Sequence, residues 1–304
     1  MIITLTGNNS FGWQRRLSQI VADFKREYGD LAVERLEGEE ISPEGLIESL
    51  KSLPFLANRK LALVRDLSFN KPAAEQLEQI ISSVGESCDF IILEPTVDRR
   101  SVYFKVLKNQ TELEDFSALD GRNLASWLVN EAKQQGAKLN LADANYLVER
   151  VGEDQQLLAS ELSKLLTYNP EISRSSIDIL TEKAPQSRVF DLLDAAFNGQ
   201  KERALKLYEE QRAQRIEPQA ILPMMTWQLN LMALTSLGKD KTSGEIAKDT
   251  GGSAFPLDKA KRLASKAGSQ KLARMIDEAY KIDLDFKSTS IDTDEALRTF
   301  IATL

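Results

Sequence analysis

The sequence predicts an α/β domain followed by two all-helical domains. Within the first 120 of the chain's 304 residues, short apolar runs alternate with amphipathic stretches, the pattern of a parallel sheet covered by helices on both faces. After Asp120-Gly121 the apolar runs stop, and helical spacing continues to the end. Pro185-Gln186-Ser187 has the composition of a linker and divides the helical part in two. The expected domains are therefore 1–120, 121–184 and 185–304.

The expected strands and helices of the first domain follow one another regularly. Short apolar or alternating runs bounded by turn residues indicate strands, and apolar residues at three- and four-residue spacing indicate helices. Ser42 is placed as a helix N-cap, with Pro43 in the first turn. The expected strands are 2–5, 32–36, 60–64, 90–93 and 113–116, and the expected helices are 11–28, 43–50, 75–84 and 102–108.

The rest of the chain has the pattern of helices separated by stop signals. Gly136, Gly152 and Asn169-Pro170 each follow a helical pattern and are expected to end it. The expected helices are 124–135, 141–151, 155–166 and 173–182 before the linker, and 189–198, 203–215, 218–237, 243–250, 257–267, 272–286 and 293–303 after it.

The composition excludes several kinds of chemistry. The chain has no histidine, which removes Ser-His-Asp hydrolysis, His-ligated zinc and imidazole acid–base catalysis. Its single cysteine, Cys88, can form no intramolecular disulfide and is expected to be a small packed residue. No apolar run is long enough for a membrane span, and the first residues lack the basic stretch of a signal peptide. We therefore expect a cytoplasmic protein with no membrane partner.

The net charge of −7 is unevenly distributed. Residues 184–304 carry 18 basic and 17 acidic residues, so residues 1–183 carry the remaining 21 basic and 29 acidic ones, a net of −8. A uniformly basic nucleic-acid binder is thereby excluded, whereas a locally basic face is not. Residues 259–274 hold six basic residues and no acid, and helical spacing places Lys259, Arg262 and Lys266 on one side. These three are candidate DNA-phosphate contacts, although an ordinary solvated helix face is the more common explanation of such a pattern.

The most informative local pattern follows the first expected strand. Gly7 and Gly12 have the G-x-x-x-x-G spacing and the position of a phosphate loop. A working loop continues with Lys, which neutralises phosphate charge, and then Ser or Thr, which holds Mg²⁺. Here those places hold Trp13 and Gln14, which supply neither. The strand expected to bring a metal-binding acid is followed by Arg65-Asp66, whose cation opposes metal binding.

These residues indicate a nucleotide-type fold without ATPase activity, with no catalytic residue, no metal site and no cofactor. Two alternatives stay open. The glycines can serve only to turn the chain, or the chain can be a phosphate- or nucleotide-binding, ATPase-like enzyme that uses the loop from Gly7 to Gly12 in an unusual way. In the last third, the carboxylates around Asp283 and Asp292 lie far in sequence from this loop and are not expected to be catalytic, and Trp227 is expected in the core of the helical bundle.

Five stretches, in order along nearly the whole chain, carry a family resemblance. They are the degenerate loop; Ser52-Leu53-Pro54-Phe55-Leu56-Ala57-Asn58-Arg59-Lys60 before an apolar strand; Ser160-Glu161-Leu162-Ser163-Lys164-Leu165; Val189-Phe190-Asp191-Leu192-Leu193-Asp194-Ala195 followed by Gly199 and Ala204-Leu205; and Glu245-Ile246-Ala247 leading to Phe255-Pro256. Together they resemble the delta-subunit family of the bacterial DNA polymerase III clamp loader. The one departure noted is Ser160, where the family usually has Asn.

The resemblance implies a fold and a function. The fold would be a degenerate AAA+ (RecA-like) parallel-sheet domain, a small helical lid domain and a C-terminal helical collar that oligomerises with the other clamp-loader ATPase subunits. The chain would be a non-catalytic subunit that binds the sliding clamp (the beta subunit) and opens it for loading onto primed DNA. It would be classed with a DNA-directed DNA polymerase only as a subunit of the holoenzyme.

Phe55 and Leu56 are the candidate clamp-binding residues. Pro54 disfavours helical geometry at Leu53 and marks a boundary, so two large apolar side chains would be presented in a loop. From the residues alone, packing against their own sheet is the favoured arrangement, and matching them to the family's clamp-contacting pair reverses this in favour of exposure. A third reading keeps the assembly but makes the chain another nucleotide-free scaffold subunit that does not touch the clamp.

Overall fold

The computed structural model describes residues 1–52, 57–252 and 254–304, without the side chain of residue 122. The chain divides into two compact units, Met1–Ala118 and Leu119–Leu304, and each is described by itself. The segment that holds Phe55 and Leu56, the candidate clamp-binding residues, lies outside the described residues.

The first unit is built on a five-stranded parallel sheet with the order β2-β3-β4-β1-β5. Its central strand β4 is buried at every position, because helices cover both faces of the sheet. The strands are β1 (Ile2–Thr6), β2 (Val33–Glu37), β3 (Lys60–Arg65), β4 (Cys88–Glu94) and β5 (Glu112–Asp115). The helices are α1 (Ser10–Tyr28), α2 (Pro43–Lys51), α3 (Lys71–Glu75), α4 (Leu77–Ser82) and α5 (Val102–Gln110), with short 3-10 turns at Asp30–Ala32 and Leu67–Phe69.

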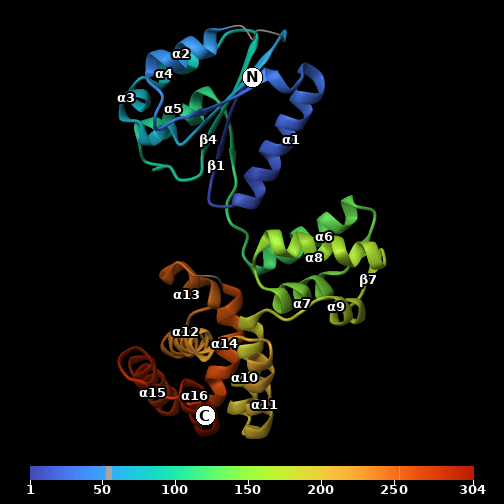
Figure 1. Ribbon diagram of the computed structural model, residues 1–304, viewed down its shortest axis with the longest axis vertical. Coiled ribbons are helices and arrows are strands. Elements are labelled where there is room, and N and C mark those ends of the chain that lie inside the picture. The colour runs from blue at the N-terminus through green and yellow to red at the C-terminus, as the bar shows by residue number, and fades with distance from the viewer. Residues whose placement is uncertain (53–56, 253) are drawn as a thin grey trace. The chain divides into compact units, whose positions relative to one another are not determined.

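Alternation along the strands sends side chains into two separate cores. Leu61 and Leu63 of β3 pack on the side of α1, whereas Ala62 and Val64 pack on the side of α2, α4 and α5 (Figure 1). Cys88 is buried, as expected of a small packed residue, and burial raises the pKa of its thiol. The chain order reverses at β1, which lies between β4 and β5. Ligands of open parallel sheets bind at such a reversal, outside the carboxyl ends of the strands.

One helix of this unit differs from expectation. Residues 75–84 do not form a single helix, because α3 begins earlier, at Lys71, and ends at Glu75. The Asn70 side chain caps α3 by accepting a hydrogen bond from the Ala73 amide, and a proline in the first turn fixes the start. Gln76 leaves helical geometry before α4 begins.

The second unit begins with helices that enclose a small core of their own. They are α6 (Gly121–Gln134), α7 (Leu141–Val151), α8 (Gln155–Tyr168) and α9 (Arg174–Leu180). The expectation that strands stop after residue 120 is wrong, because β6 (Lys138–Leu139) pairs in parallel with β7 (Glu171–Ile172). Leu139 and Ile172 are buried, and two such short strands leave no periodicity for sequence reading to detect.

Most of the remaining helices, among them α12 (Pro218–Leu237), share one core. The linker expected at residues 185–187 does not exist, since these residues form the first turn of α10 (Pro185–Phe197). Proline fits there because its missing N–H would have no helical partner. Trp227 does not lie in the bundle core, because 43% of it is exposed. The other helices are α11 (Lys201–Ala213), α13 (Ser243–Thr250), α14 (Ala254–Ala267), α15 (Ser269–Ser288) and α16 (Thr293–Thr303).

None of the helices in the described part of the chain combines the length and apolarity that crossing a bilayer requires. Among the same residues, no group of three or more acidic or cysteine side chains is arranged to hold a metal ion.

Candidate functional site

The loop after β1 lies at the reversal of the sheet, and its two glycines are explained by close packing. Gly7 has φ = +110°, and a Cβ atom there would lie 2.2 Å from the backbone oxygen of Phe116. A Cβ atom on Gly12 would lie 2.9 Å from Cδ1 of the Phe116 ring. Both positions therefore require glycine because the segment that follows β5 crosses directly over the loop.

The polar groups of the loop are engaged by the chain itself. The Gly12 amide, at the start of α1, donates to Oδ1 of Asn9 at 2.9 Å. The Asn9 amide donates to the carbonyl of Phe116 at 2.9 Å, and Nδ2 of Asn9 donates to the carbonyl of Ser117 at 3.3 Å. Oδ1 of Asn8 accepts a hydrogen bond from the Ala118 amide at 2.7 Å. The Asn9 amide, a donor of the kind that a working phosphate loop would direct at phosphate oxygens, is thus used to fasten the segment after β5.

Trp13, the residue after Gly12, is buried beneath the loop. Its indole is only 6% exposed and packs in the core on the α1 side of the sheet with Ile3, Leu5 and Ile20. Gln14, the next residue, is exposed on the outer surface of α1. The structure therefore brings Gly7, Gly12 and Trp13 together, and leaves Gln14 outside. No cation or metal-holding hydroxyl replaces the missing Lys and Ser/Thr at those two positions.

A buried carboxylate that the sequence reading missed lies at the end of β4. Glu94 accepts hydrogen bonds from the Ser68 amide at 2.9 Å and the Ser68 hydroxyl at 2.7 Å, and from the Tyr103 hydroxyl at 2.6 Å. Burial raises the pKa of Glu94, although the three hydrogen bonds oppose that rise. The sequence does carry one sign of this site, because Glu94 directly follows the fully apolar strand segment 90–93. At the other acid expected to matter, Asp66, the Arg65 guanidinium binds the carboxylate at 2.8 Å.

Glu94→Gln is expected to change how stability depends on pH. In the unfolded chain Glu94 ionises near its ordinary pKa of 4.5, whereas folding raises that pKa. The folded state therefore holds the proton longer, and the wild-type free energy of unfolding should fall relative to that of Glu94→Gln as pH rises from about 4 through the raised pKa. Urea unfolding of both proteins across this range measures the difference. If the free energy of unfolding of the wild type, relative to that of Glu94→Gln, stays constant or rises with pH, the raised pKa of Glu94 is contradicted.

The two flanks of the segment 53–56 are tied together by one buried lysine. Nζ of Lys60, the first residue of β3, donates to the carbonyl of Ser49 at 2.7 Å, to the Ser49 hydroxyl at 3.0 Å and to the Ser52 hydroxyl at 3.1 Å. It also forms an ion pair with Glu34. A cation at the last turn of α2 complements the carbonyl end of that helix. Residues 52 and 60 thus have fixed positions, at the opposite edge of the sheet from the closed loop.

The three candidate DNA-phosphate residues are placed differently from one another on α14. Nζ of Lys259 pairs with Glu149 at 2.6 Å, and its side chain is only 14% exposed. Nζ of Lys266 lies 3.3 Å from Asp194 in an exposed pair. Arg262 is exposed. Of the three side chains, Lys259 is therefore the one that is largely buried in an ion pair within the chain.

Comparison with known proteins agrees with this arrangement. A family profile described as "DNA polymerase III, delta subunit" matches residues 4–116, a middle-domain profile matches 121–179, and a profile for the "DNA polymerase III delta subunit, C-terminal domain" matches 186–304. The DNA polymerase III subunit delta of Bacillus subtilis is 23% identical over 305 residues, covering 95% of this chain and 87% of that protein. A solved Bacillus subtilis protein, the DNA clamp loader delta protein YqeN, superposes with a TM-score of 0.77 at 21% identity, covering 99% of this chain and 94% of that one.

The fold defines a class first: an α/β protein with a five-stranded parallel-sheet domain followed by helical domains, as the sequence predicted. The two delta-subunit profiles then identify the particular family. The chain belongs to the DNA polymerase III delta subunit family.

Proposed function

We propose that this chain is a non-catalytic component of a cytoplasmic clamp loader, and that it binds the ring-shaped sliding clamp and opens one of its interfaces. The observation that carries the proposal is the loop after β1, in which Asn9 is hydrogen-bonded to Gly12 and Phe116 and a buried indole, Trp13, stands where a working loop has its lysine. A family member built in this way contributes binding energy to the assembly and no hydrolysis of its own.

Phe55 and Leu56 are the proposed clamp contacts. Burying two large apolar side chains in a partner's pocket would contribute roughly 3–6 kcal/mol before the costs of association. The fixed positions of Ser52 and Lys60 support the proposal, since a short segment held at both ends loses less entropy on binding than a free one. Opening follows if the pair binds the open interface better than the closed one, because only differential affinity shifts such an equilibrium.

The direct test is binding of the purified chain to an immobilised sliding clamp, followed by an opening measurement. Two fluorophores placed across one clamp interface should separate when the chain is added without nucleotide. Binding and separation support the proposal. Absence of direct binding would instead favour a scaffold subunit that never touches the clamp.

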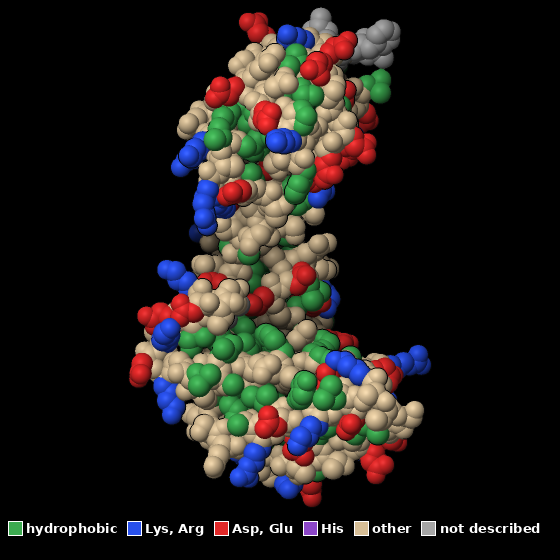
Figure 2. Space-filling model, turned by 90° about the vertical axis from the view of Figure 1, so that its left-hand side faces the viewer, with side chains coloured by type: hydrophobic (Ala, Val, Ile, Leu, Met, Phe, Trp, Pro, Cys, Tyr) green, Lys and Arg blue, Asp and Glu red, His purple; other side chains and the backbone are tan. Residues whose placement is uncertain are grey.

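The helical region after residue 185 is proposed as the surface that assembles with the other clamp-loader subunits. Figure 2 looks at the side of the second unit that carries α12, α13 and α15, and hydrophobic side chains gather there. Large exposed apolar residues on two of these helices support the assignment: Leu234, Leu237, Tyr280 and Leu284. Uncovered apolar surface of this kind is typical of protein–protein interfaces.

Leu237→Asp is expected to block assembly and leave the fold intact. Leu237 is 87% exposed at the last turn of α12, so an aspartate there costs little in the isolated chain. In an apolar interface the buried carboxylate would have no partner. Gel filtration with the other subunits should show at least a tenfold loss of complex (about 1.4 kcal/mol). Leu31→Asp is the matched control, because Leu31 is a leucine of the first unit that is 78% exposed. Normal assembly of Leu237→Asp would contradict the proposed surface.

DNA contact by α14 is proposed for Arg262 and Lys266, whose side chains are exposed, rather than for Lys259. Arg262→Ala in the assembled loader is expected to weaken binding to primed DNA and to reduce the slope of log K against log salt by about 0.9, the value for one phosphate contact. Lys259→Ala should leave that slope unchanged. If Arg262→Ala leaves the salt dependence of DNA binding unchanged, the proposed phosphate contact of Arg262 is contradicted.

A further inference from the structure

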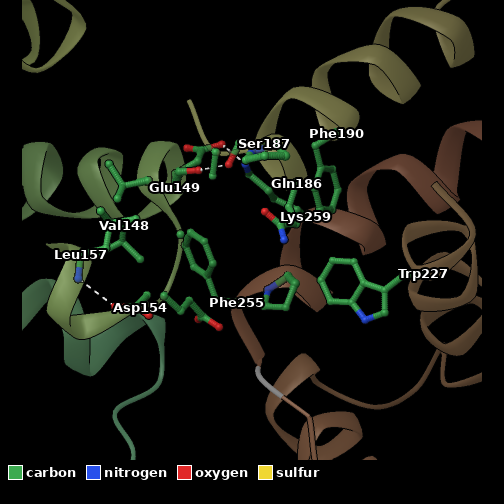
Figure 3. A pocket seen from close by; sticks show the side chains of 16 residues that line it. Val148, Glu149, Asp154, Leu157, Gln186, Ser187, Phe190, Trp227, Phe255 and Lys259 are labelled. Atoms are coloured by element: carbon green, nitrogen blue, oxygen red, sulfur yellow. Dashed lines mark hydrogen bonds and ion pairs between the residues drawn. The ribbon is translucent and has the colours of Figure 1, made fainter. Parts of the chain in front are cut away.

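A lysine is buried at the start of β3, shortly after the proposed clamp contacts. Only 6% of Lys60 is exposed, and a buried ammonium group costs free energy unless it is paired and hydrogen-bonded. Lys259 is buried in a comparable way, and it joins α14 to α7 through its ion pair with Glu149; both side chains are labelled in Figure 3. Lys60 should likewise be explained by the parts of the chain that it joins.

The partners of Lys60 lie on α2 and β2. Nζ donates to the carbonyl of Ser49 at 2.7 Å, and to the hydroxyls of Ser49 and Ser52 at 3.0 and 3.1 Å. It also pairs with Glu34 of β2, whose carboxylate accepts a further hydrogen bond from the Ser49 hydroxyl at 2.9 Å. Ser49 lies in the last turn of α2 and Ser52 is its C-cap. One ammonium group therefore joins the residue before the segment 53–56 to the first residue of β3.

The residues that follow the segment are also held to the sheet in other ways. The Arg59 guanidinium donates to the carboxylate of Asp89 on β4 at 2.7 Å, and the Asp89 side chain is only 8% exposed. Ala57 packs against the core on the α1 side of the sheet. The downstream flank of the segment is thus anchored independently of Lys60. What Lys60 adds is a direct connection between this flank and the end of α2.

We propose that Lys60 is a positioning residue for clamp binding. Its ammonium group holds the end of α2 and the start of β3 at a fixed separation, which limits the conformations open to the segment between them before the clamp is met. The inference rests on the proposed function, since it takes Phe55 and Leu56 as the clamp contacts. A preorganised segment loses less conformational entropy on binding, and apparent affinity falls in proportion to the fraction of molecules that are competent to bind.

Lys60→Met is the variant that isolates this role. Methionine keeps an unbranched side chain in the buried position and removes the charge. The Ser49 carbonyl still accepts hydrogen bonds from the Ser52 amide at 3.1 Å and from the Ser52 hydroxyl at 2.8 Å, and the Ser49 hydroxyl still donates to Glu34. The Glu34 side chain is 41% exposed and stays hydrated. The variant should therefore fold, which circular dichroism and urea unfolding verify.

Surface plasmon resonance with immobilised sliding clamp separates the two rates of binding. Lys60→Met should associate about tenfold more slowly and dissociate at the wild-type rate, because the contacts in the complex are unchanged and only the competent fraction of the free chain is smaller. Leu56→Ala should instead dissociate faster, since it removes a contact and leaves Lys60 in place. Lys105→Met removes the same charge from an exposed position on α5 and should keep both wild-type rates.

Ser52→Ala is a second variant that does not disturb a buried position. Ser52 is exposed, and the change removes one of the hydroxyls that Lys60 binds, so association should slow by about threefold with dissociation unchanged. Wild-type association rates for a folded Lys60→Met and for Ser52→Ala would overturn the role of Lys60 and leave the clamp contact in place. Faster dissociation of Lys60→Met would also overturn it. Absence of clamp binding by the wild-type chain would instead contradict the proposed function, and this inference with it.

Discussion

Replacing Phe55 and Leu56 together by alanine is expected to abolish binding to the sliding clamp. The two side chains supply most of the apolar area proposed to enter the clamp, and losing roughly 3–6 kcal/mol would lower the affinity by a factor of more than 100. Surface plasmon resonance with immobilised clamp measures the effect. The thermal midpoint of the variant should lie within about 2 °C of the wild-type value, because side chains that contact a partner rather than their own domain contribute little to its stability.

The matched control for this experiment is Phe69→Ala. Phe69 is also a large aromatic residue of the first unit and is 63% exposed, but it follows β3 at the opposite edge of the sheet from residues 52 and 60. The Phe69→Ala variant should therefore bind the clamp normally. A large fall in the thermal midpoint of the double variant would show that Phe55 and Leu56 pack in their own domain. Retained clamp binding by a folded double variant would remove them from the contact.

Restoring the phosphate-loop motif is expected to destabilise the protein without creating nucleotide binding. Trp13→Lys removes a buried indole, which typically costs about 3–5 kcal/mol, and leaves an ammonium in an apolar core. The thermal midpoint should fall by roughly 10 °C or more. Titration of the wild type and of Trp13→Lys with Mg²⁺-ATP should show no binding, since Asn8 and Asn9 of the loop are hydrogen-bonded to residues 116–118 whichever residue stands at position 13.

Gln14→Thr is the control for this prediction. Gln14 is exposed, so the threonine variant should be as stable as the wild type while carrying the hydroxyl that a working loop uses. It too should fail to bind Mg²⁺-ATP. Micromolar binding by the wild type or by Gln14→Thr would support the alternative of an ATPase-like enzyme and would contradict a loop closed by its own chain.

Much of the candidate site could be predicted from residue types. The spacing of Gly7 and Gly12, with Trp13 and Gln14 after them, was enough to indicate a phosphate loop without its cation and hydroxyl. The role of Phe116 could not be predicted, because it depends on the segment after β5 crossing over a loop more than 100 residues earlier. The same holds for Glu94, whose hydrogen-bond donors Ser68 and Tyr103 lie 26 and 9 residues away in the sequence and are brought to it by the fold.

The sequence by itself determined the fold class, the family resemblance and most helix positions, since apolar periodicity and stop signals are local properties. It misplaced features whose outcome depends on contacts across the chain: β6 and β7, the start of α10, and the exposure of Trp227. Only the tertiary structure decided which partner each polar or aromatic group meets. Lys259, read as a phosphate contact, is held by Glu149 on another helix, because burial and charge pairing are fixed by packing between segments rather than by spacing within one.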